Sequence, residues 1–241
     1  MPPALPAATI TRREDITADL WKIWLKPEIP FKFKPGQYCT IGFDDVERAY
    51  SIVSSPYEEQ IELFIELVPP PFGNLTPLLY ELRVGRQVTL RPRAKGVFTL
   101  DERYSHHLMV ATVTGVAAYI SILRSYLHDL RSGHKFYVLL GASYANELTY
   151  DKELQEMARA HPDYITCIPT VSRPREERNL GWEGETGRVN TLLEKYLERF
   201  RLDRDDTLVY ACGHPGMIED VKVRAAALDF LVQEERFWKM S

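Results

Sequence analysis

A short stretch near residue 50 joins three kinds of side chain that suit a flat ring carrying a phosphate tail. Arg48, Ala49, Tyr50 and Ser51 follow one another in the chain. In an extended strand Arg48 and Tyr50 point to one face and Ser51 to the other. Arg48 could then neutralise a diphosphate, Tyr50 could pack on a sugar-alcohol chain or ring, and Ser51 could hydrogen-bond the ring edge. The alternative is an exposed arginine and a half-buried tyrosine on a barrel strand.

Arginines gather in a second region further along the chain. Arg173 and Arg175 lie in one stretch, and Arg188 follows it after Gly187. Guanidiniums bind phosphate oxygens in a bidentate manner, so two or three of them could enclose a dianionic phosphate. The alternative is a basic surface loop. Its charge would be balanced by Glu176, Glu177 and Glu183.

A third segment could contact phosphate through its backbone. Residues 69–71 are three prolines that form a rigid break, and Gly73, Asn74, Leu75 and Thr76 follow. The pattern predicts a short helix over 74–82, and the N-terminus of a helix attracts anions. The alternative is that Asn74 or Thr76 only caps this helix, with no ligand.

Cysteines and histidines form no metal or nucleophile pattern. The three cysteines lie far apart without a Cys-x-x-Cys pair, which argues against a zinc site, a disulfide framework and a built-in iron–sulfur cluster. The six histidines lack His-x-x-x-His spacing, so we expect no metal site and no catalytic triad. Cys212, within Cys-Gly-His-Pro, is the one cysteine at a strand end, and a buried free thiol is its plain interpretation.

The expected secondary structure that positions these residues changes near residue 100. Before it, short alternating segments such as 61–68 are punctuated by proline and glycine, which predicts a small antiparallel barrel. After it, longer apolar strands alternate with helices, which predicts a parallel sheet covered on both faces. The expected strands are 107–113, 135–141, 164–171 and 207–212, and the expected helices are 116–130, 150–160, 188–200 and 215–232. Ligands of such a sheet bind beyond the carboxyl ends of its strands.

Composition narrows the class of protein. The chain has 241 residues, 45% of them hydrophobic, which is enough for one or two domains. A net charge of −4 does not predict nucleic-acid binding. No apolar run approaches the roughly 20 residues of a membrane span, and the first residues lack the pattern of a secretion signal. We therefore expect a cytoplasmic protein that binds neither nucleic acid nor membrane.

Four motifs in order resemble the ferredoxin–NADP+ reductase family, most closely its bacterial ferredoxin/flavodoxin reductase branch. They are Arg-Ala-Tyr-Ser with the following 52–56, Gly-Asn-Leu-Thr at 73–76, the segment 110–117, and Tyr-Ala-Cys-Gly-His-Pro at 210–215. The resemblance runs over nearly the whole chain. It implies two domains: an antiparallel β-barrel that binds FAD over residues 1–101, and a parallel-sheet, Rossmann-like α/β domain that binds NADP(H) over residues 102–241.

The resemblance also assigns individual residues. To FAD it assigns Arg48, Ala49, Tyr50, Ser51, Gly73, Asn74, Leu75 and Thr76. To NADP(H) it assigns Thr114 and Gly115 at the diphosphate and Arg173 and Arg188 at the 2′-phosphate. Beyond Glu235, it implies that Phe237 stacks on the flavin and that Trp238 lies toward the adenine. Catalytic roles fall to Ser51, to Cys212 beside the nicotinamide, and to Glu235.

The chain departs from the family's pattern at three places. Val113 replaces the first glycine of the family's Gly-Thr-Gly-Ile-Ala-Pro loop and Ala118 replaces its proline. A β-branched side chain thus stands where the family brings backbone close to phosphate. A further family arginine, after the second strand, corresponds to Ser143, which predicts a weaker preference for the phosphate.

The implied activity is exchange of hydride with NADP(H) and of single electrons with a separate ferredoxin or flavodoxin. Five basic residues between 83 and 95, with no acid among them, could attract an acidic partner in a transient complex of a monomeric enzyme. They are Arg83, Arg86, Arg91, Arg93 and Lys95. The alternatives are a flavin or quinone reductase of the same superfamily and a non-catalytic flavin electron-relay subunit.

Overall fold

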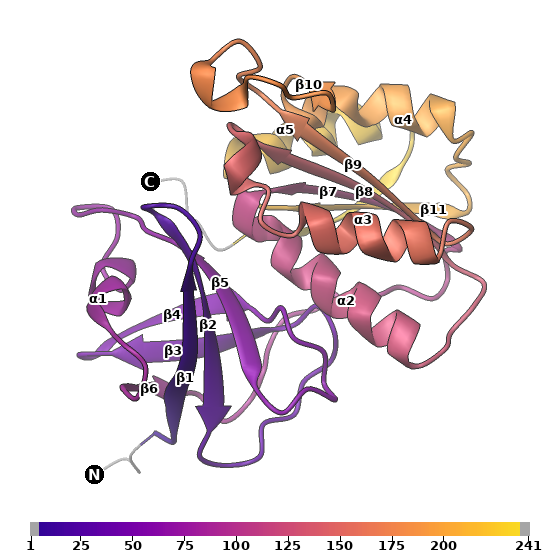
Figure 1. Cartoon of the computed structure of the whole chain (residues 1–241). Helices are drawn as coiled ribbons and strands as arrows, with labels where there is room; N and C mark the ends of the chain where they lie inside the picture. Colours follow the sequence, from indigo (N-terminus) through magenta and orange to yellow (C-terminus); the bar gives the residue numbers. More distant parts are fainter. Residues whose placement is uncertain (1–4, 237–241) are drawn as a thin grey trace. The chain divides into compact units, whose positions relative to one another are not determined.

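The computed structural model describes residues 5–236, which group into two compact units (Figure 1). The first unit contains residues 5–100 together with Ala117–Leu130. The second contains Asp101–Val116 and residues 131–236. A single helix of the second half of the chain therefore groups, by its contacts, with the N-terminal unit.

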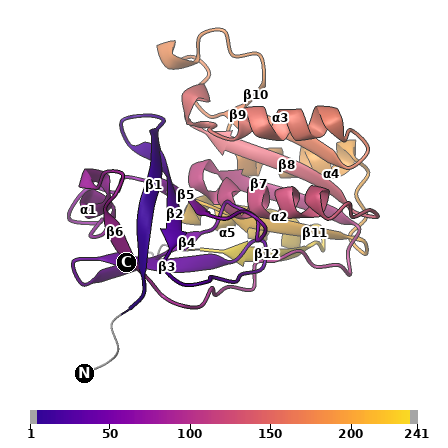
Figure 2. The ribbon, with the colours of Figure 1, turned by 60° about the horizontal axis from the view of Figure 1, so that its bottom comes forward.

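The first unit is an antiparallel sheet whose edges meet. Its strand order is β4-β3-β6-β1-β2-β5, and β3 and β4 lie side by side in Figure 2. An isolated antiparallel bridge from Ile52 to Leu63 joins the segment after β4 to β5, which closes the sheet into a barrel. The strands are β1 Ala7–Asp15, β2 Leu20–Pro27, β3 Tyr38–Phe43, β4 Val46–Ser51, β5 Ile61–Glu66 and β6 Gln87–Leu90, with the helix α1 Thr76–Glu81 before β6. The predicted antiparallel barrel is confirmed.

Alternation of side chains explains the barrel interior. Ile23 and Leu25 on β2 face Ile61 and Leu63 on β5, and all four are buried. The apolar residues of one strand thus pack on those of its neighbour, as the period of two requires. Helix α2 Ala117–His128 adds to this unit, where the Ser121 hydroxyl donates to the Ser54 carbonyl over 2.7 Å.

The second unit is a parallel sheet in the order β10-β9-β8-β7-β11-β12. Its strands are β7 His106–Thr112, β8 Lys135–Ala142, β9 Ile165–Val171, β10 Glu185–Thr186, β11 Thr207–Cys212 and β12 Leu231–Glu235. Its helices are α3 Asp151–Ala160, α4 Leu193–Arg199 and α5 Pro215–Ala226. The first strand in sequence, β7, lies between β8 and β11, so the order reverses beside it. Such a reversal marks the ligand-binding edge of an open parallel sheet.

The middle of the central strand β7 is apolar because it is buried on both faces of the sheet. Leu108 and Val110 face the helices α4 and α5, while the alternate residues Met109 and Ala111 are buried as well. A strand covered on both faces has no polar alternation, which distinguishes β7 from the barrel strands. The predicted parallel sheet is confirmed.

One predicted element is wrong: the last helix does not reach residue 232. Helix α5 ends at Ala226. Three residues later Asp229 adopts a positive φ of 60°, and the Phe230 amide donates back to the Ala225 carbonyl over 2.9 Å. The apolar residues that follow form β12, which pairs in parallel with β11. A short apolar run has no periodicity that separates the end of a helix from a buried strand.

Within residues 5–236, no helix is long and apolar enough to cross a membrane.

Candidate functional site

The end of β4 carries the first predicted group. Arg48 is exposed, and its Nη1 donates to the Glu47 carbonyl over 2.7 Å. Tyr50 packs against the barrel core, and burial raises the pKa of its phenol, so the ring stays neutral. The Ser51 hydroxyl is buried and has no hydrogen-bond partner among the described residues. A buried hydroxyl without a partner costs free energy, so this atom suits a ligand that would accept or donate there.

The loop before α1 is built around a glycine and a threonine. A Cβ on Gly73 would lie 1.7 Å from the Val68 carbonyl oxygen, so only glycine fits. The Thr76 hydroxyl accepts from the Val68 amide over 3.0 Å and donates to the Val68 carbonyl over 3.1 Å. The helix begins after Leu75 without a side-chain cap, and Asn74 is exposed. The Thr76 hydroxyl therefore holds the loop closed and does not cap the helix.

Two turns at the reversal point of the parallel sheet pack backbone against backbone. Gly115, in the turn Val113–Val116 after β7, allows no side chain, because a Cβ would lie 2.1 Å from the Cys212 carbonyl oxygen. A Cβ on Gly213 would lie 2.2 Å from Thr112 Oγ1. The same Oγ1 accepts from the His214 amide over 2.8 Å. The ends of β7 and β11 are thus interlocked.

Val113 has a positive φ of 42° in the same turn. This left-handed region is easy for glycine and costly for a β-branched residue. The departure from the family's glycine therefore has a structural counterpart, since the valine keeps the backbone conformation that a glycine would adopt without strain.

Cys212 and Glu235 are register partners at the ends of β11 and β12. Both are buried. Burial, and to a lesser degree the Glu235 carboxylate, raises the pKa of the Cys212 thiol. The thiol therefore stays protonated and is not an activated nucleophile.

Parallel pairing brings the two predicted arginines to the same sheet edge. Thr186 on β10 pairs with Val171 on β9, and Arg188 and Arg173 each lie two residues beyond this pair. Both side chains are exposed. The Gly187 amide donates to the Val171 carbonyl over 2.9 Å, which ties the two stretches together just before Arg188.

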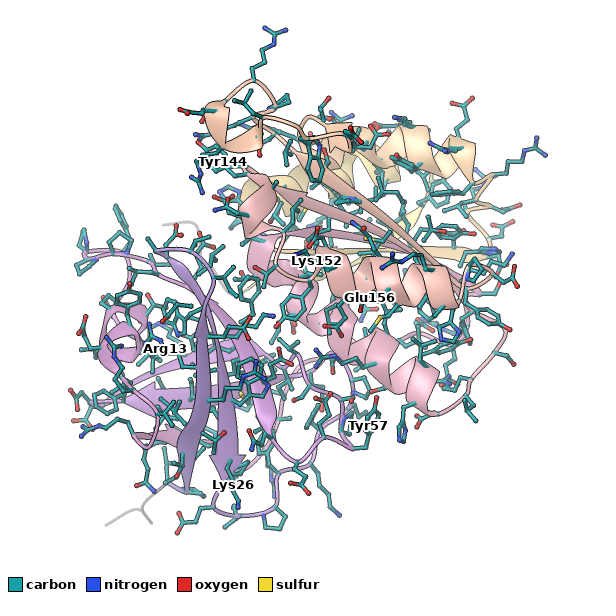
Figure 3. The ribbon with its side chains drawn as sticks, in the orientation of Figure 1. Arg13, Lys26, Tyr57, Tyr144, Lys152 and Glu156 are labelled. Atoms are coloured by element: carbon teal, nitrogen blue, oxygen red, sulfur yellow. The ribbon has the colours of Figure 1, made fainter. Side chains whose placement is uncertain are left out.

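Sequence reasoning missed Tyr144 and Arg178, which join Arg173. The Arg178 guanidinium lies 3.6 Å from the centre of the Tyr144 ring, and Arg173 Nη1 donates to the Tyr144 hydroxyl over 2.9 Å. Figure 3 shows Tyr144 beside the loop that follows β9. Its position just after β8, at a carboxyl end, is the signal that could have identified it.

Two further points concern the chain end and metal ligands. Phe237 and Trp238 lie outside the described residues, so their predicted positions on a flavin stay predictions. Within residues 5–236 no group of three or more His, Cys, Asp or Glu side chains could hold a metal ion.

Known proteins resemble this chain along most of its length. Residues 109–223 match the family model described as an oxidoreductase NAD-binding domain. The flavodoxin/ferredoxin–NADP reductase of Escherichia coli (strain K12) is 30% identical over 224 residues, which cover 88% of this chain and 86% of that protein. The protein of the same name from Buchnera aphidicola subsp. Schizaphis graminum is 29% identical over 229 residues, covering 88% and 87%. A ferredoxin NADP+ reductase from Neisseria gonorrhoeae, solved with bound FAD and NADP, has a TM-score of 0.82 at 23% identity, covering 98% of this chain and 100% of that one.

The chain thus combines a closed antiparallel barrel with a parallel sheet that has a tight glycine turn at its reversal point, and its residues 109–223 match an oxidoreductase family model. The chain belongs to the flavodoxin/ferredoxin–NADP reductase family, because it shares 30% identity with a member over most of both chains. The predicted family, fold class and enzyme type are confirmed.

Proposed function

We propose that this protein is an FAD-dependent reductase that exchanges hydride with NADP(H) and single electrons with a ferredoxin or flavodoxin. Residues 1–101 are assigned to FAD and residues 102–241 to NADP(H). The observation that carries the proposal is the buried Ser51 hydroxyl, which lacks a partner among the described residues at the end of the strand that bears Arg48 and Tyr50.

The residues of β4 fit a flavin. Ser51 offers an unused hydrogen bond to the ring, neutral Tyr50 offers an apolar face, and exposed Arg48 offers a guanidinium to the diphosphate. Ala49, between them, adds only backbone. When bound, FAD supplies the two-electron to one-electron conversion that no amino-acid side chain performs.

The loop at 73–76 completes the proposed flavin site through its backbone. The Thr76 hydroxyl is engaged by Val68, so Thr76 acts by holding the loop, and the backbone of Asn74 and Leu75 is the part offered to a diphosphate. Gly73 permits this loop, because any side chain there would meet the Val68 carbonyl.

The turn at 113–116 and the arginines fit a dinucleotide. Gly115 and Thr114 bring backbone to the carboxyl end of β7, where the diphosphate is expected. Arg173 and Arg188, two residues beyond one paired end of the sheet, offer guanidiniums to a 2′-phosphate.

Cys212 and Glu235 are proposed to act on the reacting end of the nicotinamide. Cys212 is a neutral, buried thiol that orients the ring without attacking it. Glu235, its register partner, offers a buried carboxyl group beside it. Ser51 offers its hydroxyl at the flavin.

The one-electron partner is proposed to be acidic and its complex transient. Of the five basic residues between 83 and 95, Arg91 forms an ion pair with Glu47 over 2.6 Å, and the other four form no ion pair among residues 5–236. Such a patch raises the rate of encounter with an acidic protein at low salt. We further propose a monomeric, cytoplasmic enzyme.

The test is the purified protein itself. We expect a yellow protein that releases FAD on denaturation and reduces ferredoxin or flavodoxin with NADPH. A colourless protein that cannot be reconstituted with FAD would end the proposal. Reduction of free flavin or quinone, but of neither carrier protein, would favour the flavin or quinone reductase instead.

A further inference from the structure

A carboxylate stands inside the basic cluster at the end of β9. Glu176 Oε2 accepts a hydrogen bond from the Tyr144 hydroxyl, and Glu176 Oε1 lies 3.6 Å from Arg173 Nη1. Arg173 Nη1 in turn donates to the Tyr144 hydroxyl over 2.9 Å. The three side chains therefore form a closed ring in which Glu176 is the anion.

A buried asparagine sets the backbone beneath this ring. Asn179 Oδ1 accepts from the Ala145 amide over 2.8 Å. Its Nδ2 donates to the Ser143 carbonyl over 3.0 Å and to the Arg173 carbonyl over 2.9 Å. Because Asn179 is only 3% exposed, the loops after β8 and β9 are tied together at the point from which Tyr144 and Arg173 project.

A second guanidinium completes the cluster. Arg178 stacks on the Tyr144 ring at 3.6 Å and donates to Asn146 Oδ1 over 3.1 Å. Arg178 Nη2 also lies 3.5 Å from Glu147 Oε1, so the charge of Arg178 is paired with Glu147. The Arg173 guanidinium and the Tyr144 phenol are the groups that contact Glu176, whose side chain is 49% exposed. An arrangement of this kind recognises an anion, and Glu176 already supplies one.

We propose that Glu176 is a specificity-determining residue, whose carboxylate occupies the place on Arg173 and Tyr144 that a 2′-phosphate would take. The inference rests on the proposed function, in which Arg173 binds that phosphate. NADP(H) must displace or tolerate a like charge there, whereas the 2′-hydroxyl of NAD(H) can donate to a carboxylate. Glu176 thus lowers the preference for NADPH over NADH.

The test is Glu176→Gln, which removes the charge and keeps an oxygen for the Tyr144 hydroxyl. Titration calorimetry of the flavin-loaded protein should show adenosine 2′,5′-bisphosphate binding about tenfold more tightly, equivalent to about 1.4 kcal/mol, with ADP unchanged. In steady state the KM for NADPH should fall and the KM for NADH should not. The matched control is Glu177→Gln, which removes the same charge from the exposed neighbour.

Two patterns of binding would overturn the proposal, as would the absence of any effect of Glu176→Gln. One is an equal gain for ADP and the bisphosphate in Glu176→Gln; the other is an equal effect of Glu177→Gln, since both would indicate a general change of charge. The variant Arg173→Ala distinguishes failure of the role of Glu176 from failure of the proposed 2′-phosphate site. If that variant leaves bisphosphate binding unchanged, the 2′-phosphate site itself is misplaced, whereas if it weakens binding and Glu176→Gln has no effect, only the role of Glu176 fails.

Discussion

The proposed flavin residues and the proposed 2′-phosphate residues are held in place by different forces. Around Ser51, position comes from a strand register and from burial, and the key hydroxyl has no partner among the described residues. Around Arg173, the buried Asn179 holds the loop backbone, and the exposed side chains already satisfy one another through Glu176 and Tyr144.

This contrast predicts different costs of binding. A buried hydroxyl without a partner among the described residues would gain a hydrogen bond from a flavin, so the proposed site on β4 would be preorganised. An exposed ion pair is worth little in water, but its members must still exchange partners before they bind a phosphate. We therefore expect substitutions at the flavin site to change cofactor retention, and substitutions at the arginine cluster to change selectivity.

The largest effect should come from Gly115→Ala, which tests the interlocked turns after β7 and β11. Its Cβ would lie 2.1 Å from the Cys212 carbonyl oxygen, so the turn must shift. We expect the free energy of unfolding to fall by about 3 kcal/mol, and NADP+ binding to weaken with it. Gly216→Ala is the control, because the nearest atom to its Cβ is 3.3 Å away on the His214 side chain. Equal stability of the two variants would show that the interlocked turns are not rigid.

Next in size is Arg48→Ala, which tests the preorganised site. Loss of a charged partner to a diphosphate should cost about 1.5–3 kcal/mol of FAD affinity, measured by flavin release during ultrafiltration. Arg93→Ala, an exposed arginine of the same unit, should retain FAD. Retention of FAD by both variants would remove Arg48 from the site.

The arginine cluster is tested by the double variant Arg173→Ala and Arg188→Ala. We expect the KM for NADPH to rise by about tenfold or more, because charge-assisted bonds to the 2′-phosphate are lost. The KM for NADH should stay nearly constant, which steady-state kinetics with both nucleotides will measure. A similar loss for both nucleotides would mean that these arginines only support the loop.

The smallest effect should be the salt dependence of the basic residues between 83 and 95. Screening over about 8–10 Å at physiological ionic strength should slow reduction of an added ferredoxin several-fold. Reduction of ferricyanide by the same enzyme should slow less, because a small ion does not need this surface. Equal salt dependence for the two acceptors would reject the patch.

Sequence reasoning succeeded where periodicity and topology determine position. Alternation along residues 61–68 predicted a barrel strand, which the structure has at Ile61–Glu66, and apolar strands separated by helices predicted the parallel sheet. The carboxyl ends of parallel strands meet at one edge, which drew attention to the loop that carries Arg173. Arg188 was joined to Arg173 by the family resemblance, because the short strand β10 before Arg188 was not predicted.

Prediction from the sequence failed where contacts between loops determine the positions of side chains. The Tyr144 ring stacks on the Arg178 guanidinium, and its hydroxyl donates to Glu176. The spacing of these residues in the sequence does not indicate this, because it is Asn179 that brings their two loops together, through three hydrogen bonds. The end of α5 was misjudged for a related reason. The parallel edge of β11 stabilises the residues after Asp229 as a strand, and that edge is distant in sequence.

The most direct test of the account is an anaerobic titration of the purified protein with NADPH, followed by addition of oxidised ferredoxin or flavodoxin. We expect NADPH to bleach the visible flavin band at a lower concentration than NADH does, and we expect the carrier protein to restore the band. A flavin band that NADPH does not bleach, or that the carriers leave bleached, would contradict the central claim.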